Sequence, residues 1–231
     1  MTMTMTERDL SRWTARPRPD GSPLDGRWCR LEKLDPARHG DDLYASAIAA
    51  GSDDRFRYLP DGPPSDRAEY DQWLARAAQS SDPLYYAVID RATGRAEGRQ
   101  TLMRITPEYG VIEIGNILWG PAIARTRVAT EALYLFARYS FDALGYRRFE
   151  WKCNASNAPS RRAADRFGFA FEGIFRKHMV VKGENRDTAW YAMTDDDWPR
   201  IRAGMERWLD PSNFHADGRQ KMSLKEAFSV A

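Results

Sequence analysis

Residues 111–119 read Val111-Ile112-Glu113-Ile114-Gly115-Asn116-Ile117-Leu118-Trp119, and Gly120-Pro121 follows them. A run of β-branched and apolar residues closed by Gly-Pro predicts a buried strand. Between Ala129 and Leu144 the apolar residues recur with a helical period instead, and Gly145 is suited to end that helix in a left-handed conformation. Residues 146–153 alternate as a half-buried strand does. The segment therefore predicts a strand, a helix and a strand joined by a right-handed parallel crossover.

The loop before the predicted helix has the composition of an anion-binding site. It places Arg125 and Arg127 beside the helix start near Val128. Free backbone N–H groups and the positive end of the helix dipole favour a phosphate at such a position. An ordinary strand–helix–strand unit with two solvated arginines would explain the same residues, and the residues alone leave both interpretations open.

Three further segments, in this order, make the pattern specific. They are Ala129-Thr130-Glu131-Ala132-Leu133, Asn157-Ala158-Pro159-Ser160 and Arg166-Phe167-Gly168-Phe169-Ala170-Phe171-Glu172-Gly173. Together with the strand and the loop, they resemble the acetyl-CoA-binding core of the GNAT acetyltransferases, in particular the RimJ/RimL-like branch that acetylates amino groups. The resemblance covers about residues 27–193.

The resemblance implies an α/β fold with a mixed, mostly antiparallel sheet, a central splayed parallel strand pair and flanking helices. It also implies that acetyl is transferred from acetyl-CoA to a primary amine by direct attack, without an acetyl-enzyme. The acceptor would be a protein N-terminus, an amino acid or a small polyamine-type molecule. A catalytically weak CoA-binding or regulatory protein is the alternative.

One part of the loop departs from the family pattern, which is usually Gln/Arg-x-x-Gly-x-Gly/Ala. Aligned on Ala129-Thr130-Glu131, this chain has Ala124 and Arg127 where the family has Gln/Arg and glycine. Glycine lets the backbone approach a pyrophosphate closely. We expect Arg127 either to point outward or to contact phosphate through its guanidinium.

Mapped onto this chain, the resemblance implies three groups of acetyl-CoA contacts. Backbone of the first central strand and the end of the second would flank the pantetheine, the loop and helix start would hold the pyrophosphate, and the Asn-x-x-Ser positions would contact the cofactor arm. These residues are Ile117, Leu118, Trp119, Asn154, Ala124, Arg125, Thr126, Arg127, Val128, Ala129, Thr130, Asn157 and Ser160. Asn157 has a second, structural use as a helix N-cap.

Acid–base chemistry is expected from few residues. Many family members use a tyrosine as the acid for the leaving thiolate, but this chain has Ala164 there, so Ser160 is the candidate acid. The position of a glutamate base in some relatives is Met179 here, and the neighbouring His178 faces away if its strand is regular. Glu113, on the central strand, is then the candidate base. It could equally be an outward-facing sheet carboxylate.

Residues 53–64 are expected to be irregular and polar, and Ser65 is expected to cap a helix that runs through Gln79. The acceptor side is expected to lie under the first helices. Candidate walls of the acceptor pocket are Phe56, Tyr58, Tyr70 and Trp73, each of which could be ordinary core instead. Asp53, Asp54, Asp61 and Asp66 would suit a polycationic acceptor if they lined a pocket, although a solvated loop face explains them as well.

Composition narrows the remaining classes. The 231 residues carry a net charge of +2, from 35 basic and 33 acidic side chains, so no global field favours nucleic acid. No window approaches the roughly 18 consecutive apolar residues of a membrane span. Two isolated cysteines, Cys29 and Cys153, indicate a reducing compartment, and we expect a cytoplasmic protein without a metal.

Three regions are expected along the chain. Residues 1–26 form an arm, disordered at its start, which Trp13 would anchor; residues 27–209 form the acetyltransferase-like domain. Residues 210–231 form a polar tail that packs loosely or engages a second subunit, so a homodimer is possible.

Overall fold

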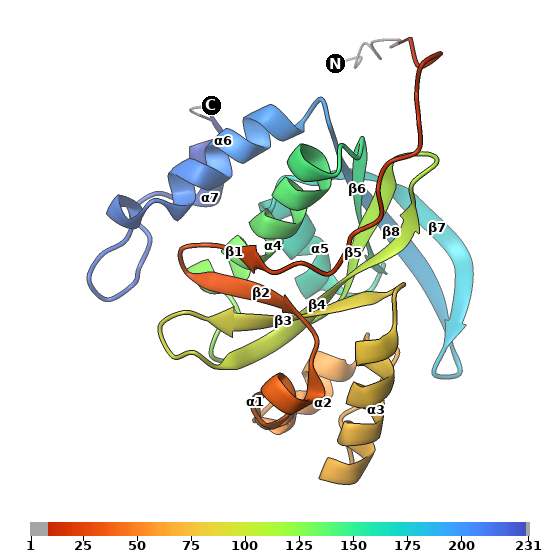
Figure 1. Ribbon diagram of the computed structural model, residues 1–231, viewed down its shortest axis with the longest axis vertical. Helices are drawn as coiled ribbons and strands as arrows, with labels where there is room; N and C mark the ends of the chain where they lie inside the picture. Colours follow the sequence, from red (N-terminus) through yellow and green to blue (C-terminus); the bar gives the residue numbers. More distant parts are fainter. Residues whose placement is uncertain (1–8, 230–231) are drawn as a thin grey trace.

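The structure is a computed structural model that describes residues 9–229. Its strands form one sheet in the order β1-β2-β3-β4-β5-β6-β8-β7 (Figure 1). The strands are β1 (Leu24–Asp25), β2 (Cys29–Lys33), β3 (Leu84–Asp90), β4 (Ala96–Thr106), β5 (Val111–Trp119), β6 (Arg148–Asn154), β7 (Ala170–Val181) and β8 (Glu184–Thr194). The helices are α1 (Pro36–Ile48), α2 (Ser52–Phe56), α3 (Arg67–Gln79), α4 (Arg127–Arg138), α5 (Ala158–Arg166), α6 (Trp198–Leu209) and α7 (Leu224–Ser229), with short π and 3-10 turns η1 (Tyr139–Ala143) and η2 (Pro211–Asn213).

The central strand pair is the feature that positions the site. Strands β5 and β6 are parallel, and every other neighbouring pair is antiparallel. Their pairing ends after the Ile114↔Trp151 step, so the carboxyl-terminal parts of the two strands diverge. Asn116 adds a bulge to β5 just beyond this step, with a left-handed φ of 48°. The expected mixed sheet with a splayed parallel pair is confirmed.

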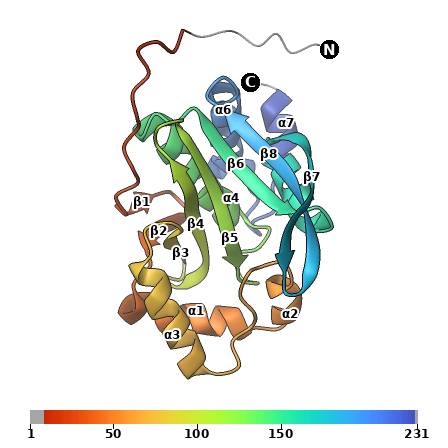
Figure 2. The same cartoon turned by 90° about the vertical axis from the view of Figure 1, so that its right-hand side faces the viewer.

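Helices cover the two faces of this sheet unequally. Helices α4, α5 and α6 pack on one face around a core that includes Ile112, Ile114, Phe149 and Trp151. Helices α1 and α3 enclose a smaller core on the other face, near the end of the sheet where β5 and β6 diverge (Figure 2). The rest of that second face is left to the polar side chains of β4, β5, β6 and β8.

The two ends of the described chain are held to the body. Trp13 donates its indole N–H to the Glu108 carbonyl at 2.7 Å, which confirms the expected anchor. The start of the arm, where disorder is expected, lies outside the described residues. The loose packing expected for the tail is wrong, because Phe214, Leu224 and Ala227 are buried, and Phe228 packs on Gly204 of α6.

Two local expectations before β3 also need correction. Residues 53–64 were expected to be irregular, but Ser52–Phe56 form the short helix α2, whose buried Phe56 fixes it to the smaller core. Helix α3 is capped by Asp66 and not by Ser65, because the Asp66 carboxylate accepts the Glu69 N–H at 2.8 Å. Ser65 instead binds the Glu69 side chain.

Candidate active site

A large cavity of about 950 Å³ opens at the start of helix α4. Thr126 caps this helix, and Arg127 is its first residue, so the loop predicted from the sequence delivers the helix N-terminus to the cavity. The cavity is lined by six arginines and two aspartates: Arg27, Arg91, Arg125, Arg127, Arg166, Arg219, Asp90 and Asp217.

Most of these arginines lack a carboxylate partner. Arg91 and Arg219 form ion pairs with Asp25 and Asp217. The other four, Arg27, Arg125, Arg127 and Arg166, form no ion pair with any carboxylate of the described chain. A helix N-terminus surrounded by unpaired guanidinium groups is a site for an anion with more than one charge.

Arg127 occupies the position where the family usually has glycine, and its side chain does not point outward. Its guanidinium lies 3.8 Å from the ring centroid of Trp28 and 5.3 Å from that of Phe214, and all three residues line the cavity. Planar cations stack favourably on aromatic faces. Arg127 is therefore held at the cavity wall, where its N–H groups can reach a phosphate.

Sequence reasoning missed the part of the cavity outside the central segment. Trp28, Trp208, Phe214 and residues 217–220 line it, although they lie far apart in the sequence. The buried carboxylate of Glu131 on α4 fixes Trp28 by accepting three backbone N–H groups, from Arg27, Trp28 and Cys29, at 2.8, 2.5 and 2.7 Å. The one sequence feature that could have indicated this contact between α4 and residues 27–29 is Glu131, an acidic residue within the Ala-Thr-Glu-Ala segment.

Of the predicted cofactor residues, Arg125, Thr126, Arg127 and Val128 line the cavity. Ala124, Ala129 and Thr130 belong to the same loop and first helical turn, and Thr130 accepts a hydrogen bond from Arg166 at 3.2 Å. Ile117, Leu118 and Trp119 lie beyond the bulge in β5, at the diverging end of the central pair.

Ser160 lies across this divergence from β5. The Trp151 indole N–H donates to Ser160 Oγ at 3.0 Å. Two ring contacts continue from Trp151 to β5. The Phe167 ring lies 6.2 Å from that of Trp151 and 6.1 Å from that of Trp119, measured between centroids. Because the indole occupies one lone pair of Ser160 Oγ, the Ser160 hydroxyl keeps its proton as a donor, and the Cys153 thiol lies within hydrogen-bond reach of it.

Asn157 has the capping role considered for it. Its side-chain oxygen accepts the Ser160 N–H at 3.1 Å, so it fixes the first turn of α5 and the position of Ser160. Asn154, the last residue of β6, accepts the Ser156 N–H at 2.9 Å and shapes the turn into α5. Ala164 is fully buried in the core, with no hydroxyl to offer.

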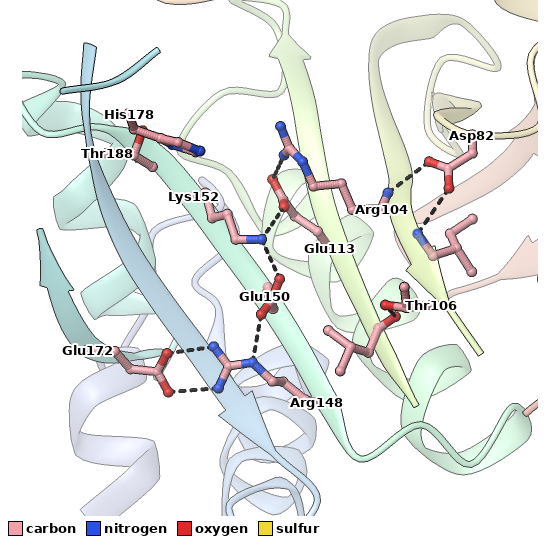
Figure 3. A network of polar contacts seen from close by, with 12 residues as sticks. Asp82, Arg104, Thr106, Glu113, Arg148, Glu150, Lys152, Glu172, His178 and Thr188 are labelled. Carbon is pink, nitrogen blue, oxygen red and sulfur yellow. Dashed lines mark hydrogen bonds and ion pairs between the residues drawn. The ribbon is translucent and has the colours of Figure 1, made fainter. Parts of the chain in front are cut away.

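Glu113 is the centre of a charged network on the face opposite α4 (Figure 3). Only 2% of the residue is exposed, because neighbouring charged side chains cover it on this face of the sheet. Arg104 contacts one carboxylate oxygen at 2.8 Å, and Lys152 contacts the other at 2.9 Å. Asp82 accepts the backbone N–H groups of Arg104 and Ile105, which fixes the irregular turn of β4 from which Arg104 reaches Glu113.

The network continues along β6 to the edge strand. Lys152 pairs with Glu150 at 2.5 Å, Arg148 donates to Glu150 at 2.7 Å, and Arg148 binds both oxygens of Glu172 (Figure 3). This pairing holds the pKa of Glu172 below its usual range and raises that of Arg148. The network therefore consists of alternating charges that satisfy one another.

His178 does not face away, contrary to expectation. Strand β7 has a register shift between Phe175 and Met179, with Lys177 at a left-handed φ of 51°, so the alternation assumed from the sequence fails there. His178 Nδ1 lies 2.9 Å from Thr188 Oγ1, on the same face as Lys152 (Figure 3). Desolvation, and then the nearby cations Arg186, Arg104 and Lys152, lower the pKa of His178.

The loop after α2 closes over this end of the sheet. Buried Arg99 pairs with Asp61 at 2.5 Å and donates to the Asn116 carbonyl at the β5 bulge at 3.2 Å. Tyr58 donates to the Ser156 carbonyl at 3.3 Å, and Lys182 of the β7–β8 turn donates to the Phe56 and Asp61 carbonyls. These bonds join the loop to both diverging strands.

The predicted acceptor walls divide between core and loop. Phe56 and Tyr70 are buried in the smaller core, whereas Trp73 stacks on Tyr70 and lies 4.3 Å from the Arg99 guanidinium. The four aspartates do not form an acidic pocket: Asp61 pairs with Arg99, Asp66 caps α3, and Asp53 and Asp54 lie in the first turn of α2.

Other chemistries receive little support. Among residues 9–229, no group of three or more His, Cys, Asp and Glu side chains is arranged to hold a metal ion. Burial raises the pKa of both thiols, Cys29 and Cys153, although the hydrogen bond with Ser160 acts to lower that of Cys153. None of the helices in the described part of the chain is both long and apolar enough to span a bilayer.

Known proteins share this architecture. Residues 30–170 match the acetyltransferase (GNAT) domain. The chain is 53% identical to a GCN5-related N-acetyltransferase from Brucella melitensis, whose crystal structure superposes with a TM-score of 0.94 over 95% of this chain and 100% of that one. A probable GNAT-family acetyltransferase from Chromobacterium violaceum is 38% identical, with a TM-score of 0.77 over 86% and 99% of the two chains.

A curated relative is matched over a shorter region. The uncharacterized N-acetyltransferase YnaD from Bacillus subtilis is 29% identical over 86 residues. These residues are 37% of this chain, and the match spans half the length of that relative.

Proposed function

Because this chain belongs to the GNAT acetyltransferase family, we propose that it is an N-acetyltransferase that uses acetyl-CoA and transfers the acetyl group directly to a primary amine. The observation that carries the proposal is the arginine-lined cavity at the start of α4. Acetyl-CoA carries a pyrophosphate and a further phosphate, and the four unpaired arginines around the helix N-terminus suit such a polyanion.

The proposed path of the cofactor follows the divergence of the central strands. With the phosphates at the α4 cavity, the pantetheine arm would run toward the end of β5–β6 pairing, past Trp119 and Asn154. Backbone N–H groups near Ile117 and Leu118 would polarise the thioester carbonyl. Loss of strand pairing at this point supports the proposal, because paired strands would have no free N–H groups to offer.

Two side chains would move protons in this scheme. Ser160 would donate its hydroxyl proton to the departing thiolate. Glu113 would accept the proton of the amine through a water molecule. The amine would approach from the face of the sheet opposite α4, which we call the acceptor face. His178 lies on that face as well, and we treat it as the competing base.

We further propose that the protein belongs to the RimJ/RimL-like branch, on the Asn157-to-Ser160 and Arg166-to-Gly173 motifs. The buried free thiols support a cytoplasmic location. The acceptor would be a small molecule or a peptide. A homodimer is also proposed, because the edge strand β7 exposes Phe171, Phe175 and Val180; sedimentation velocity showing only monomer at micromolar concentration would exclude it.

Calorimetry should detect binding of CoA and much weaker binding of pantetheine, which lacks the phosphates. Arg125→Ala and Arg127→Ala should each raise the KM for acetyl-CoA by about tenfold or more, because a hydrogen bond to a charged group contributes about 1.5–3 kcal/mol. Arg200→Ala, an exposed arginine on α6, is the matched control and should have no effect. Equal affinity for CoA and pantetheine would contradict the proposal. Tight CoA binding without acetyl transfer to any amine would favour a CoA-binding regulator.

Ser160→Ala should lower kcat by about tenfold or more while acetyl-CoA affinity changes little, because an acid that acts on the leaving group matters only in the transition state. Asn157→Ala is the companion variant: it should cost about 1 kcal/mol of unfolding free energy through the lost cap, along with some cofactor affinity. Stopped-flow measurements would establish that chemistry limits kcat. Full kcat in Ser160→Ala under that condition would assign the proton to water or to the substrate.

A further inference from the structure

The acceptor face of the sheet carries one cation more than its network can neutralise. Arg104, Arg148 and Lys152 are balanced by Glu113, Glu150 and Glu172, each through contacts of 2.9 Å or less. On the neighbouring strand β4, Arg99 is balanced by Asp61. Arg186 on β8 is left over, because no carboxylate of the described residues forms an ion pair with it.

The surroundings of Arg186 are unfavourable for a cation in the absence of a ligand. The side chain is half-buried, and its one hydrogen bond to the residues that the structure describes runs from Nε to Thr188 Oγ1 at 3.2 Å. Glu113 is the carboxylate whose charge acts on Arg186, but the two form no ion pair. His178 shares the same hydroxyl, and Lys152 lies 4.0 Å from the ring centroid of Trp190, two residues beyond Thr188. A half-buried guanidinium among other basic groups, with its terminal nitrogens unused, is arranged to receive an anion.

The position of Arg186 relates this anion to the acceptor. Thr188 pairs with Asn154, the last residue of β6, so Arg186 lies just past the end of that strand, on the face of Thr188. Hydrogen bonds tie the loop after α2 to the chain just past β6, from Tyr58 to the Ser156 carbonyl, and to the β7–β8 turn, from Lys182 to the Asp61 carbonyl. An amine that attacks at the divergence of β5 and β6 from this face would have Arg186 beside it.

We propose that the acceptor of this enzyme is an amine that also carries an anionic group, a carboxylate or a phosphate, and that Arg186 binds that group. This inference rests on the proposed acetyl transfer and narrows its substrate. It opposes a polycationic acceptor, since the aspartates considered for such a ligand are neutralised by Arg99, used as a helix cap, or placed in the first turn of α2. Arg186 acts on binding and orientation of the acceptor and leaves the acetyl donor untouched.

Matched pairs of acceptors test the proposal, with thiol release from acetyl-CoA as the readout. One arm compares α-amino acids with their α-amides, and a second compares 2-aminoethyl phosphate with ethanolamine. Loss of the carboxylate lowers the pKa of the amine, so at neutral pH a larger fraction of the amide is present as the unprotonated, reactive amine. A preference for the acid therefore cannot come from the availability of neutral amine. The arm that shows the preference identifies carboxylate or phosphate.

In the wild type, kcat/KM for the anionic member should exceed that for its neutral partner by about tenfold or more. Arg186→Gln should bring this ratio close to one with an unchanged KM for acetyl-CoA, and Arg186→Lys should restore part of it. Arg176→Gln, an exposed arginine on the same hairpin, should keep the wild-type ratio.

Three results would overturn the inference: a wild-type ratio near or below one in both arms, an equal loss for both members in Arg186→Gln, or transfer to neutral amines only. In each of these cases the proposed function would still hold if calorimetry detects binding of acetyl-CoA. Absence of acetyl-CoA binding would instead overturn the proposed function itself.

Discussion

Glu113→Gln is expected to lower kcat/KM for the amine acceptor by about 10²–10⁴-fold at neutral pH, the contribution of a positioned base. Without a base, the reaction depends on the fraction of amine that is already neutral. For an alkyl amine with a pKa near 10.4, the neutral fraction rises about tenfold with each pH unit, as long as the pH is below the pKa. The deficit of the variant should therefore shrink as the assay pH is raised, and a pH–rate profile would show it.

Glu150→Gln is the matched control for this variant. Glu150 faces Glu113 in the β5–β6 register, is similarly buried and also contacts Lys152, so its loss disturbs the same network. We expect a small deficit that does not vary with pH. Equal, pH-independent losses in both variants would assign Glu113 a structural role. A large pH-dependent loss in His178→Gln alone would move the base to that histidine.

Glu131→Ala is expected to reduce the free energy of unfolding by about 3 kcal/mol or more. Glu131 is only 4% exposed, and its carboxylate accepts the N–H groups of Arg27, Trp28 and Cys29. Each buried donor left without an acceptor costs about 1–3 kcal/mol. Gly26 packs directly against the same carboxylate, where a Cβ atom would lie 2.4 Å from an oxygen, so it has no side chain that could fill the space left by the truncation. Urea unfolding would measure the loss.

Two comparisons sharpen that measurement. Glu131→Gln keeps one acceptor oxygen and should lose less, and Glu184→Ala, exposed at the start of β8, should lose almost nothing. A loss below about 1 kcal/mol in Glu131→Ala would mean that water replaces the carboxylate. Because Trp28 lines the cavity, Glu131→Ala should also weaken CoA binding at temperatures where the variant is folded.

Much of the architecture could be predicted because its signals are local. The period of the apolar residues identified β5, α4 and β6, and Gly145, with a left-handed φ of 69°, ends the helical segment as expected. The family resemblance added the mixed sheet and the splayed central pair. Helix starts could be misplaced by a residue, as at Asp66, because neighbouring Ser and Asp are both good caps and only the geometry selects one.

The candidate site was harder to predict, because it depends on departures from regular structure. The bulge at Asn116 and the register shift before Met179 depend on pairing with the neighbouring strand, and neither has a glycine at the positive-φ position to mark it. The second of these turned His178 to the face of the sheet that carries Lys152 and Thr188. The arginine-lined cavity also draws on Trp28 and Phe214, which only the tertiary fold brings together.

The strand order has a consequence for how the chain acquires its structure during synthesis. Strands β1 to β5 lie side by side in the order in which they leave the ribosome, so this half of the sheet can assemble from neighbouring segments. Strand β6 gains its second neighbour only when β8 has been made, because β7 is made before β8 but lies at the outer edge of the sheet. We therefore expect the half that holds Ser160 and Arg186 to be completed last. Within the sheet, the short parallel ladder from Val111 to Ile114 joins it to the earlier half. The divergence at which acetyl transfer is proposed marks the boundary between an early-folding and a late-folding part of the molecule.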